Sequence, residues 1–514
     1  MHATKNVFTA TLILTTANLI SKLMGFFYRV FMSNTIGAEG MGLYQLVMPI
    51  YALAWSITAA GFTTTISHLT AQEQSKGNTE NISKILKQSL VFSFSLSILL
   101  GLVLFFGADT IAIHILQAPR TTMSLQFLSF ALPFMACGSC LRGYFLGLQS
   151  PTIPATSQVL EQTIRIAVVY VLAAPCMKLG LEMACLSAII GIIFGEFISF
   201  LYVVFVYKTH KKSTKNRIKS KGLVCSNLTI TKMILTMALP LCATRIVASL
   251  LVTIENTLIP QQLQAFGQDS TSALEVYGEL TGMAMPLIFL PSACLLAASI
   301  SLVPEISKAV ASQNHDKIKR TVSATFLFTF VLGIGVATIF AIFPREICYI
   351  VYNRQNLGEL LFPLAFICPF LYAQITIQGL LNGLGEQFFL FVNHLISSVI
   401  TIGLLLYYMP QYGIPVFFCA MGLSLFVSMM LCLARLYVRT GVFPNVSNCF
   451  IRPLLAGCAS GLSIRYIIQV SIPSKFLFLC SIASVSLLYV IFLILLGCFS
   501  ENELGLLLKK NIRK

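Results

Sequence analysis

Long, continuous apolar stretches constrain the fold of this chain more than any other feature. Hydrocarbon offers no partner to backbone N–H and C=O groups, so stretches of this length must form α-helices when they cross a membrane. The stretches do not alternate between apolar and polar residues as the strands of a membrane barrel do. We therefore predict an all-α polytopic membrane protein with about 14 transmembrane helices, at residues 6–33, 44–70, 88–107, 122–148, 155–177, 181–207, 233–258, 277–303, 321–343, 357–381, 388–409, 413–437, 450–470 and 475–498.

Composition supports this prediction. Charged residues make up 10% of the chain and hydrophobic residues 57%, and the mean hydropathy is +0.85, whereas soluble domains carry about 25% charged residues. The 15 cysteines fall mostly within apolar stretches, where cysteine packs as a small hydrophobic residue. We expect no disulfide framework, and no redox or metal role for the C-x-x-C at Cys137 and Cys140.

The chain also contains an internal repeat, in which all matching residues are separated by the same offset along the sequence. Two copies of one unit are the usual plan of a secondary transporter whose substrate path lies between the halves. Each copy has six spans, so we predict a parallel pseudo-two-fold repeat of six-helix lobes at 1–207 and 233–440. A basic cytoplasmic linker at 208–232 joins them, and helices 13–14 with a basic cytoplasmic tail follow at 441–514. The matching pairs are Pro133-Phe134 and Pro369-Phe370, Gly143 and Gly379, Gly147-Leu148 and Gly383-Leu384, and Ile164 and Ile166 with Ile400 and Ile402.

The distribution of basic residues predicts the orientation. The loops and tails on one side of the predicted spans carry 22 lysines and arginines, and those on the other side carry five. The positive-inside rule therefore places both termini in the cytoplasm. The basic run from Lys208 to Lys221 contains no acid, and between two hydrophobic spans it favours contact with anionic membrane lipids over nucleic acid.

Charged residues within the spans are candidates for a functional site, since each costs roughly 2.5–3.5 kcal/mol near the bilayer centre. Glu161 and Arg165 are four residues apart and can pair on one helix face. Lys22, Arg29 and Arg245 are the least explained by local pairing, and they come from the first span of each half. A group of cations suits an anionic head group such as a diphosphate. We predict substrate binding by Lys22, Arg29, Arg245 and Arg165, with Glu161, Glu196 and Glu255 as ion-coupling residues or charge partners.

Motifs of the common enzyme classes are absent from the sequence. It has no H-E-x-x-H, no G-x-x-x-x-G-K-[ST] and no G-x-S-x-G, so metalloprotease, P-loop and nucleophile-elbow chemistry are not indicated. The six histidines are scattered without metal-ligand spacing. We predict that the protein is not an enzyme and needs no cofactor or metal.

Several segments resemble the polysaccharide transporter family that includes stage V sporulation protein B. This family is related to lipid II flippases within the multidrug/oligosaccharidyl-lipid/polysaccharide exporter superfamily. The resemblance implies two six-helix lobes and two extra helices, which would form a groove for a lipid tail. In lipid II flippases of this type an arginine in span 1 binds diphosphate, but Tyr28 fills that position here and Arg29 lies one residue beyond it. The similar segments are Ser21–Phe26, Ile36–Gln45, Gly61–Gln74, Leu141–Gln149 and Lys178–Glu182.

The function implied by this resemblance is to flip a polyprenyl-diphosphate-linked sugar precursor, similar to lipid II, across the bacterial cytoplasmic membrane by alternating access. The product would serve peptidoglycan or spore cortex synthesis, with cell-wall synthesis proteins as partners. One alternative is a multidrug/cation antiporter of the same superfamily, although spans 13–14 and the excess of cations argue against it. The other is a non-transporting membrane scaffold for cell-wall synthesis, which would keep its function without the cations.

Overall fold

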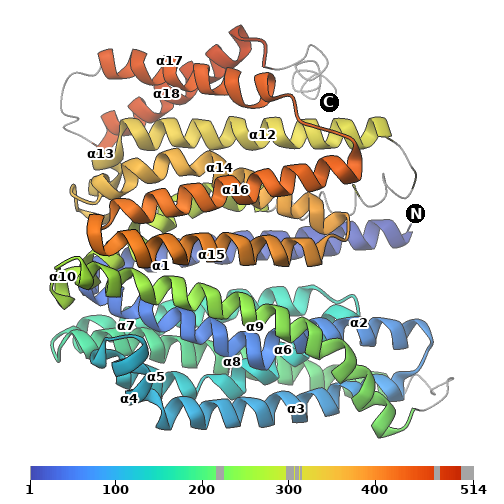
Figure 1. Cartoon of the computed structure of the whole chain (residues 1–514). Coiled ribbons are helices and arrows are strands. Elements are labelled where there is room, and N and C mark those ends of the chain that lie inside the picture. The colour runs from blue at the N-terminus through green and yellow to red at the C-terminus, as the bar shows by residue number, and fades with distance from the viewer. Residues whose placement is uncertain are drawn as a thin grey trace. The chain divides into compact units, whose positions relative to one another are not determined.

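The computed structural model describes residues 2–215, 225–296, 306, 312, 315–467 and 475–498 (Figure 1). The described residues form helices and connecting turns, without a strand. The helices in chain order are α1 (His2–Trp55), η1 (Ser56–Ala60), α2 (Gly61–Ser75), α3 (Thr79–Phe106), α4 (Ala108–Thr110), η2 (Ile111–Ile115), η3 (Pro119–Thr121), α5 (Thr122–Ser129), α6 (Leu132–Gly147), α7 (Thr152–Met177), α8 (Leu181–Lys215), α9 (Asn227–Ala265), α10 (Ser270–Tyr277), η4 (Gly278–Ala284), α12 (His315–Ile342), α13 (Pro344–Tyr352), α14 (Gly358–Gly383), α15 (Gln387–Tyr412), α16 (Pro415–Thr440), η5 (Ser447–Ile451), α17 (Arg452–Ile467) and α18 (Lys475–Leu495).

The long helix α1 contains the first predicted span and the start of the second. Its 54 residues would extend about 80 Å as a straight helix, far more than the roughly 30 Å of a bilayer core. Gly37 interrupts it with φ 72° and ψ −172°, a conformation that glycine adopts without the steric cost of a Cβ. The two predicted spans are therefore distinct segments that meet at Gly37.

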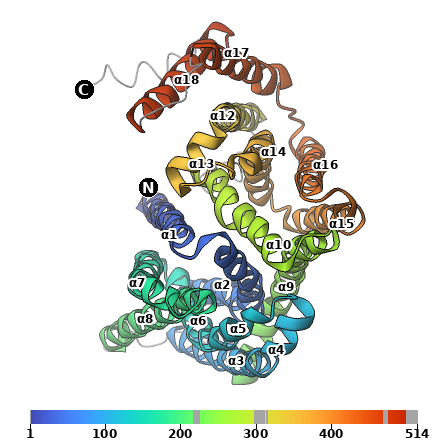
Figure 2. The same cartoon turned by 90° about the vertical axis from the view of Figure 1, so that its left-hand side faces the viewer.

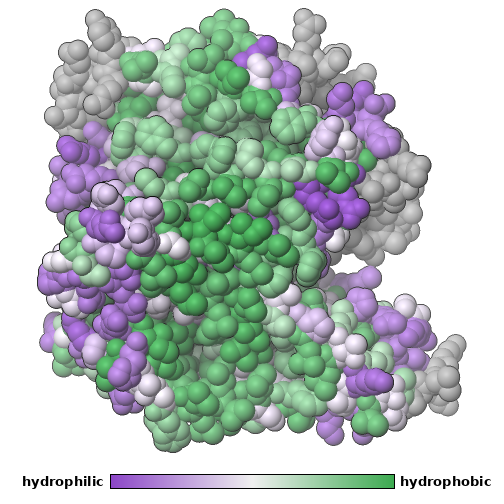
Figure 3. Space-filling model, viewed as in Figure 1, coloured by the Kyte–Doolittle hydropathy of each residue, from purple (hydrophilic) through white to green (hydrophobic). Residues whose placement is uncertain are grey.

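The described helices agree with the predicted membrane fold. Eleven of them are long and apolar enough to cross a membrane, or twelve if Pro119–Ser129 and Leu132–Gly147, which are bent by 48°, form one span. The apolar stretch Ile13–Ser75 counts once in that number, although it holds two predicted spans. Hydrophobic side chains gather over the middle of the helices and hydrophilic ones towards their ends (Figure 3). The all-α fold is confirmed, and the helix number is consistent with about fourteen spans.

The internal repeat is visible in the helix boundaries. Helices α3 and α12 are both 28 residues long, and their first residues, Thr79 and His315, are separated by the offset of the repeat. Helices α7 and α15 are both 26 residues long and keep that offset within one residue. These two pairs of described helices therefore follow the repeat, and α17 and α18 lie outside it.

The chain forms two compact units. Unit 1 consists of Met1–Met283 with Ile402–Gly413, and unit 2 consists of Ala284–Thr401 with Ile414–Lys514. In unit 1, α6 packs against α2, α3 and α8 (Figure 2), and a hydrophobic core around Ile66, Ile85 and Phe145 fills the space between helices. In unit 2, a core around Phe326 and Leu380 joins α12, α14 and α16.

The division of the chain into the four segments expected from the sequence remains a prediction, because the two compact units do not follow the boundaries of the repeat. Residues 216–224 of the basic linker and 499–514 of the basic tail lie outside the described residues.

Glycines determine how closely the helices of unit 1 approach one another. A Cβ on Gly143 would lie 2.6 Å from the carbonyl oxygen of Thr63, and one on Gly147 would lie 2.6 Å from that of Ser67. A real Cβ does not fit at such distances, so α6 reaches the backbone of α2 only because both positions are glycine. This is the close approach that G-x-x-x-G spacing favours.

Candidate functional site

Five polar side chains from four helices of unit 1 meet in its interior. We call this group the charged cluster: Tyr51 on α1, Arg142 on α6, Glu161 and Arg165 on α7, and Glu196 on α8. Gly195, next to Glu196, allows α7 and α8 to approach, because a Cβ there would lie 2.9 Å from the carbonyl oxygen of Glu161. The cluster therefore depends on close helix packing as well as on charge.

The two arginines and two glutamates of the charged cluster neutralise each other. Glu161 accepts a hydrogen bond from Nη2 of Arg165 at 2.7 Å and another from Nη1 of Arg142 at 3.5 Å. Nη2 of Arg142 lies 3.9 Å from Oε2 of Glu196, and the Tyr51 hydroxyl donates to Oε1 of Glu196 at 2.7 Å. Paired in this way, the charges offset part of the cost of leaving water.

Serines complete the surroundings of Arg142. Its guanidinium donates to the hydroxyl of Ser139 at 3.0 Å and to that of Ser199 at 3.4 Å, and Ser199 in turn bonds Ser157 at 2.9 Å. Arg142 is only 17% exposed, so its guanidinium lies inside unit 1 and not at the surface. The i, i+3 spacing of Ser139 and Arg142, repeated in Glu196 and Ser199, is the sequence signal for this polar face.

The four predicted substrate-binding residues differ in their surroundings. Lys22 and Arg245 are exposed and Arg29 is half-buried. Within the part of the chain that the structure describes, no hydrogen bond or ion pair engages any of these three. Arg165, in contrast, is held by Glu161. The predicted Glu161–Arg165 pair is therefore present, while the other three cations remain available to an external anion.

The three predicted acids also lie in different places: two belong to the charged cluster and one does not. Glu161 and Glu196 belong to the charged cluster, and Glu196 is 3% exposed. Glu255 lies half-buried on α9, a helix that contributes no residue to the cluster. Tyr51 and Arg142 were not predicted as site residues, because only the tertiary packing of α1 and α6 brings them to Glu196.

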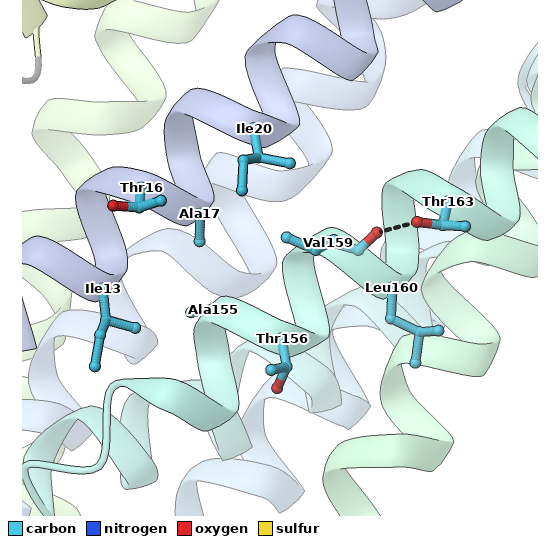
Figure 4. A pocket seen from close by; sticks show the side chains of 9 residues that line it. All are labelled: Ile13, Thr16, Ala17, Ile20, Ala155, Thr156, Val159, Leu160 and Thr163. Carbon is cyan, nitrogen blue, oxygen red and sulfur yellow. Dashed lines mark hydrogen bonds between the residues drawn. The ribbon is translucent and has the colours of Figure 1, made fainter.

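Cavities open on the described part of unit 1, and one of them is a groove along α1. This groove of about 590 Å³ between α1 and α7 is lined mainly by apolar side chains, with Ile13, Ala17 and Ile20 facing Ala155 and Val159 (Figure 4).

The second cavity has about 570 Å³, lies between α2 and α9, and is more polar. Its lining includes His68, Gln72, Thr229 and Lys232, which together offer hydrogen-bond donors and positive charge. Among the described residues, no group of three histidine, cysteine or acidic side chains is arranged to hold a metal ion.

Unit 2 carries a separate ion-pair group at a helix connection. Glu386 lies between α14 and α15, is 7% exposed, and accepts from Arg435 at 2.9 Å and from Arg439. Burial disfavours the charged carboxylate, but the hydrogen bonds from both arginines outweigh this effect and hold the pKa of Glu386 below its usual range. The guanidinium of Arg435 also lies over the ring of Phe389, 5.5 Å from its centre.

Comparison with known proteins identifies similar sequences along most of the chain. Residues 7–310 match the family described as polysaccharide biosynthesis protein. Stage V sporulation protein B of Bacillus subtilis (strain 168) is 31% identical over 396 residues, which cover 77% of this chain and 76% of that protein. The lipid II flippase MurJ of the same organism is 24% identical over 424 residues, covering 76% of this chain and 75% of that one.

Solved structures show the same fold at lower sequence identity. A lipid II flippase MurJ in an inward closed conformation aligns with a TM-score of 0.71 and 17% identity, covering 98% of this chain and all of that one. An inward-facing multidrug resistance transporter of the MATE family aligns with a TM-score of 0.66 and 13% identity, covering 84% of this chain and 99% of that one.

Proposed function

Because this chain belongs to the polysaccharide biosynthesis protein family, we propose that it flips a polyprenyl-diphosphate-linked sugar precursor, similar to lipid II, across the bacterial cytoplasmic membrane. Whatever its substrate, the protein is a multi-pass membrane transporter, as are the flippases and multidrug transporters that it resembles. Like them, it is not an enzyme. The substrate, the membrane and the orientation with both termini in the cytoplasm are our proposal.

The observation that carries this proposal is the set of three cations without a partner among the described residues. Lys22, Arg29 and Arg245 sit within apolar helices, where each charge is costly unless it meets an anion or water. A diphosphate offers several charged oxygens to such groups. Lys22 and Arg29 are two helical turns apart, so both can face the same ligand.

Arg165 contributes to the proposed site in a different way. Glu161 neutralises it, but its Nε is buried and has no hydrogen-bond partner. One donor therefore remains for a phosphate oxygen. We assign the first contacts with the diphosphate to Lys22, Arg29 and Arg245, and a secondary contact to Arg165.

Two cavities of unit 1 suit the two parts of such a substrate. The cavity at His68 and Lys232 offers positive charge next to the basic linker that we assign to the cytoplasmic side. The groove between α1 and α7 is apolar, and Lys22 follows Ile20 of its lining on α1. Alternating access would carry the head group past these cations while the polyprenyl tail stays in hydrocarbon.

The names of two relatives, a sporulation protein and a lipid II flippase, support a proposal for the cellular role. We propose service to peptidoglycan synthesis in spore formation or growth, with anionic lipids and cell-wall synthesis proteins as partners.

A multidrug/cation antiporter is the second candidate, and the shared fold of the MATE transporter favours it. Cationic drugs require acidic side chains that are free to bind them. In the charged cluster, however, Glu161 is already engaged by two arginines and Glu196 by Tyr51, whereas Lys22, Arg29 and Arg245 have no partner among the described residues. An anionic substrate therefore fits these residues better.

The test is lipid II exposure on bacteria depleted of their own flippase and expressing only this chain. We expect exposure to recover with the wild type and to be lost when Lys22, Arg29 and Arg245 are all replaced by Gln.

The matched control replaces Lys87, Lys178 and Lys208 by Gln, so the net charge falls equally. These exposed lysines lie outside the predicted spans or at a span end. Normal exposure with the first triple variant at normal protein level would refute the assigned site. If the wild-type protein is folded but does not restore lipid II exposure, lipid II is not its substrate. The proposed substrate would then be another lipid-linked glycan, and the protein would also be tested for drug export and for a scaffold role.

A further inference from the structure

The second copy of the repeat serves as an internal control for the charged cluster. At the offset of the repeat, Arg142, Glu161, Arg165 and Glu196 correspond to Gln378, Ser397, Thr401 and Cys432. All four charges of the first copy are thus neutral residues in the second.

The second copy nevertheless keeps a bonded polar layer between the same helices. Asn393 of α15 donates to the hydroxyl of Ser428 on α16 at 2.6 Å and to the sulfur of Cys432 at 3.1 Å. Gln374 of α14 donates to Ser428 at 2.6 Å as well. Asn393 corresponds to Ser157, which bonds Ser199 in the first copy. The fold therefore holds this helix layer together without charge at those positions, and the charges of the first copy call for another explanation.

Glu196 is the least satisfied member of the charged cluster. Its Oε1 accepts from Tyr51, but its Oε2 is buried and has no hydrogen-bond partner, and the nearest guanidinium nitrogen is 3.9 Å away. An ionised carboxylate with one open oxygen is expensive in a site that is 3% exposed. Glu161, in contrast, bonds both arginines.

We propose that Glu196 is a proton-binding site, which takes up a proton on Oε2 and releases it as unit 1 changes conformation. The carboxylate gains the proton from water and becomes a neutral acid, so the net charge of the cluster changes from zero to +1. A metal cation would need several oxygen ligands, whereas the site offers one open oxygen close to an arginine. A proton needs only that one lone pair.

The groups that face Glu196 come from three of the four helices that pack against α8. They are Tyr51 from α1, Arg142 from α6, and Glu161 and Arg165 from α7. Tyr44 of α1 acts on Arg165 instead, and α5, which also packs on α8, carries no titratable side chain. Tyr51 is the link to the rest of the protein. Its bond to an ionised carboxylate is charge-assisted and weakens when Glu196 is protonated.

This weakening would act on the segment of α1 that follows Gly37, which is joined at that glycine to the segment that carries Lys22 and Arg29. Tyr51 lies two residues after Pro49, whose carbonyl accepts from Thr253 of α9 at 3.3 Å. Protonation of Glu196 would thus loosen α1 from α8 close to its contact with α9. The proton site stands on this geometry alone; only its coupling to transport rests on the proposed function.

The single tryptophan of the chain reports on this region directly. Trp55 ends α1 one turn after Tyr51, so its fluorescence senses a change at the Tyr51–Glu196 bond. The experiment follows Trp55 emission of the purified full-length protein across the pH range in which it stays folded. We expect a transition in the wild type, no transition in Glu196→Gln, a shifted midpoint in Tyr51→Phe, and recovery of a transition in Glu196→Asp.

Glu80→Gln is the matched control, because Glu80 is an exposed acid that pairs with Lys84 on α3. It should keep the wild-type transition. An unchanged transition in Glu196→Gln, or none in the wild type, overturns the proton site. If the Trp55 fluorescence responds to sodium at constant pH and not to pH, the proton site is also overturned, and the site binds a metal cation.

Transport is measured separately by lipid II exposure as a function of external pH. A wild-type rate that varies with pH by up to about tenfold per unit, the limit for a single proton, should become independent of pH in Glu196→Gln. If the variant loses the fluorescence transition but transports with unchanged pH dependence, the coupling is refuted and the proton site stands. If the wild type does not transport lipid II at all, the proposed function fails while the fluorescence result is unaffected.

Discussion

At the residue scale, the cations of this protein differ chiefly in whether a carboxylate neutralises them. Arg142 and Arg165 share Glu161 in a low-dielectric interior, so removing that carboxylate would leave two uncompensated charges. Lys22 and Arg245 are exposed and have no such partner within the described residues. Glu161 therefore ties the first pair to the fold and leaves Arg165 only its Nε for a ligand, whereas the second pair is free to bind one.

Glu386 allows a stability prediction outside the membrane-spanning segments. Glu386→Gln removes the carboxylate that Arg435 and Arg439 share, and we expect it to lower the free energy of unfolding at neutral pH by about 1–3 kcal/mol. Thermal unfolding of the purified protein measures the change. The matched control is Glu359→Gln, since Glu359 is 72% exposed and pairs with Arg345 at 3.7 Å; such surface pairs contribute about 0–1 kcal/mol. Equal effects of both variants would contradict the prediction.

The stabilisation by Glu386 should also depend on pH. Its pKa is lower in the folded protein than in the unfolded chain, so the stabilisation is fully present above the unfolded pKa of about 4.3. It is lost as the pH falls through the lower, folded pKa. The difference in unfolding temperature between wild type and Glu386→Gln should therefore be constant near neutral pH and shrink in acid. A difference that grows on acidification would reverse the assigned sign.

Only part of the candidate site was predictable from the sequence. Glu161 and Arg165 are four residues apart on one helix, and that local spacing predicted their pair. Tyr51 and Glu196 are 145 residues apart, and no local pattern connects them. Long-range contacts of this kind depend on how α1 packs against α8, which hydrophobic periodicity does not specify.

At the element scale, apolar length predicts spans well and their breaks poorly. Most predicted spans correspond to helices, yet α1 runs through the first loop and is broken only at Gly37. The short helix α13 (Pro344–Tyr352) was not predicted, because nine residues carry too little periodic signal. The bend between α5 and α6 falls just before Pro133, where proline at the second position of a helix is tolerated.

Close helix packing at Gly147 gives a prediction at this scale. Gly147→Ala would place its Cβ 2.6 Å from the Ser67 carbonyl and 2.6 Å from Cβ of Thr70, so α6 and α2 must separate. We expect a loss of about 1–3 kcal/mol of stability, measured by thermal unfolding. Gly422→Ala on α16 is the control: its Cβ meets nothing within 4 Å, and alanine favours the helix. A Gly147→Ala protein as stable as the wild type would show that the packing is looser than described.

At the scale of the whole molecule, the repeat explains a reciprocal contact within unit 1. Gly42 of α1 and Gly278 of η4 occupy equivalent positions in the two copies, as do Ala38 and Leu274. A Cβ on Gly42 would overlap the carbonyl oxygen of Leu274, and one on Gly278 would overlap that of Ala38. Close by, Gln45 donates to the carbonyl of Thr281, its own equivalent in the second copy, at 2.9 Å. Equivalent segments of the two halves therefore cross at their glycines.

This reciprocity predicts a specific failure of additivity. Gly42→Ala and Gly278→Ala should each cost about 1–3 kcal/mol of stability, because each methyl group must displace the opposite backbone. One displacement of the same two segments relieves both overlaps, so the double variant should cost less than the sum of the single variants, by at least about 0.5 kcal/mol. Unfolding free energies of the four proteins form the double-mutant cycle. Gly403→Ala with Gly422→Ala is the control cycle, since neither Cβ meets an atom within 4 Å, and its effects should add. Additive costs at Gly42 and Gly278 would mean that the two overlaps are relieved independently, and that the crossing does not behave as one symmetric contact.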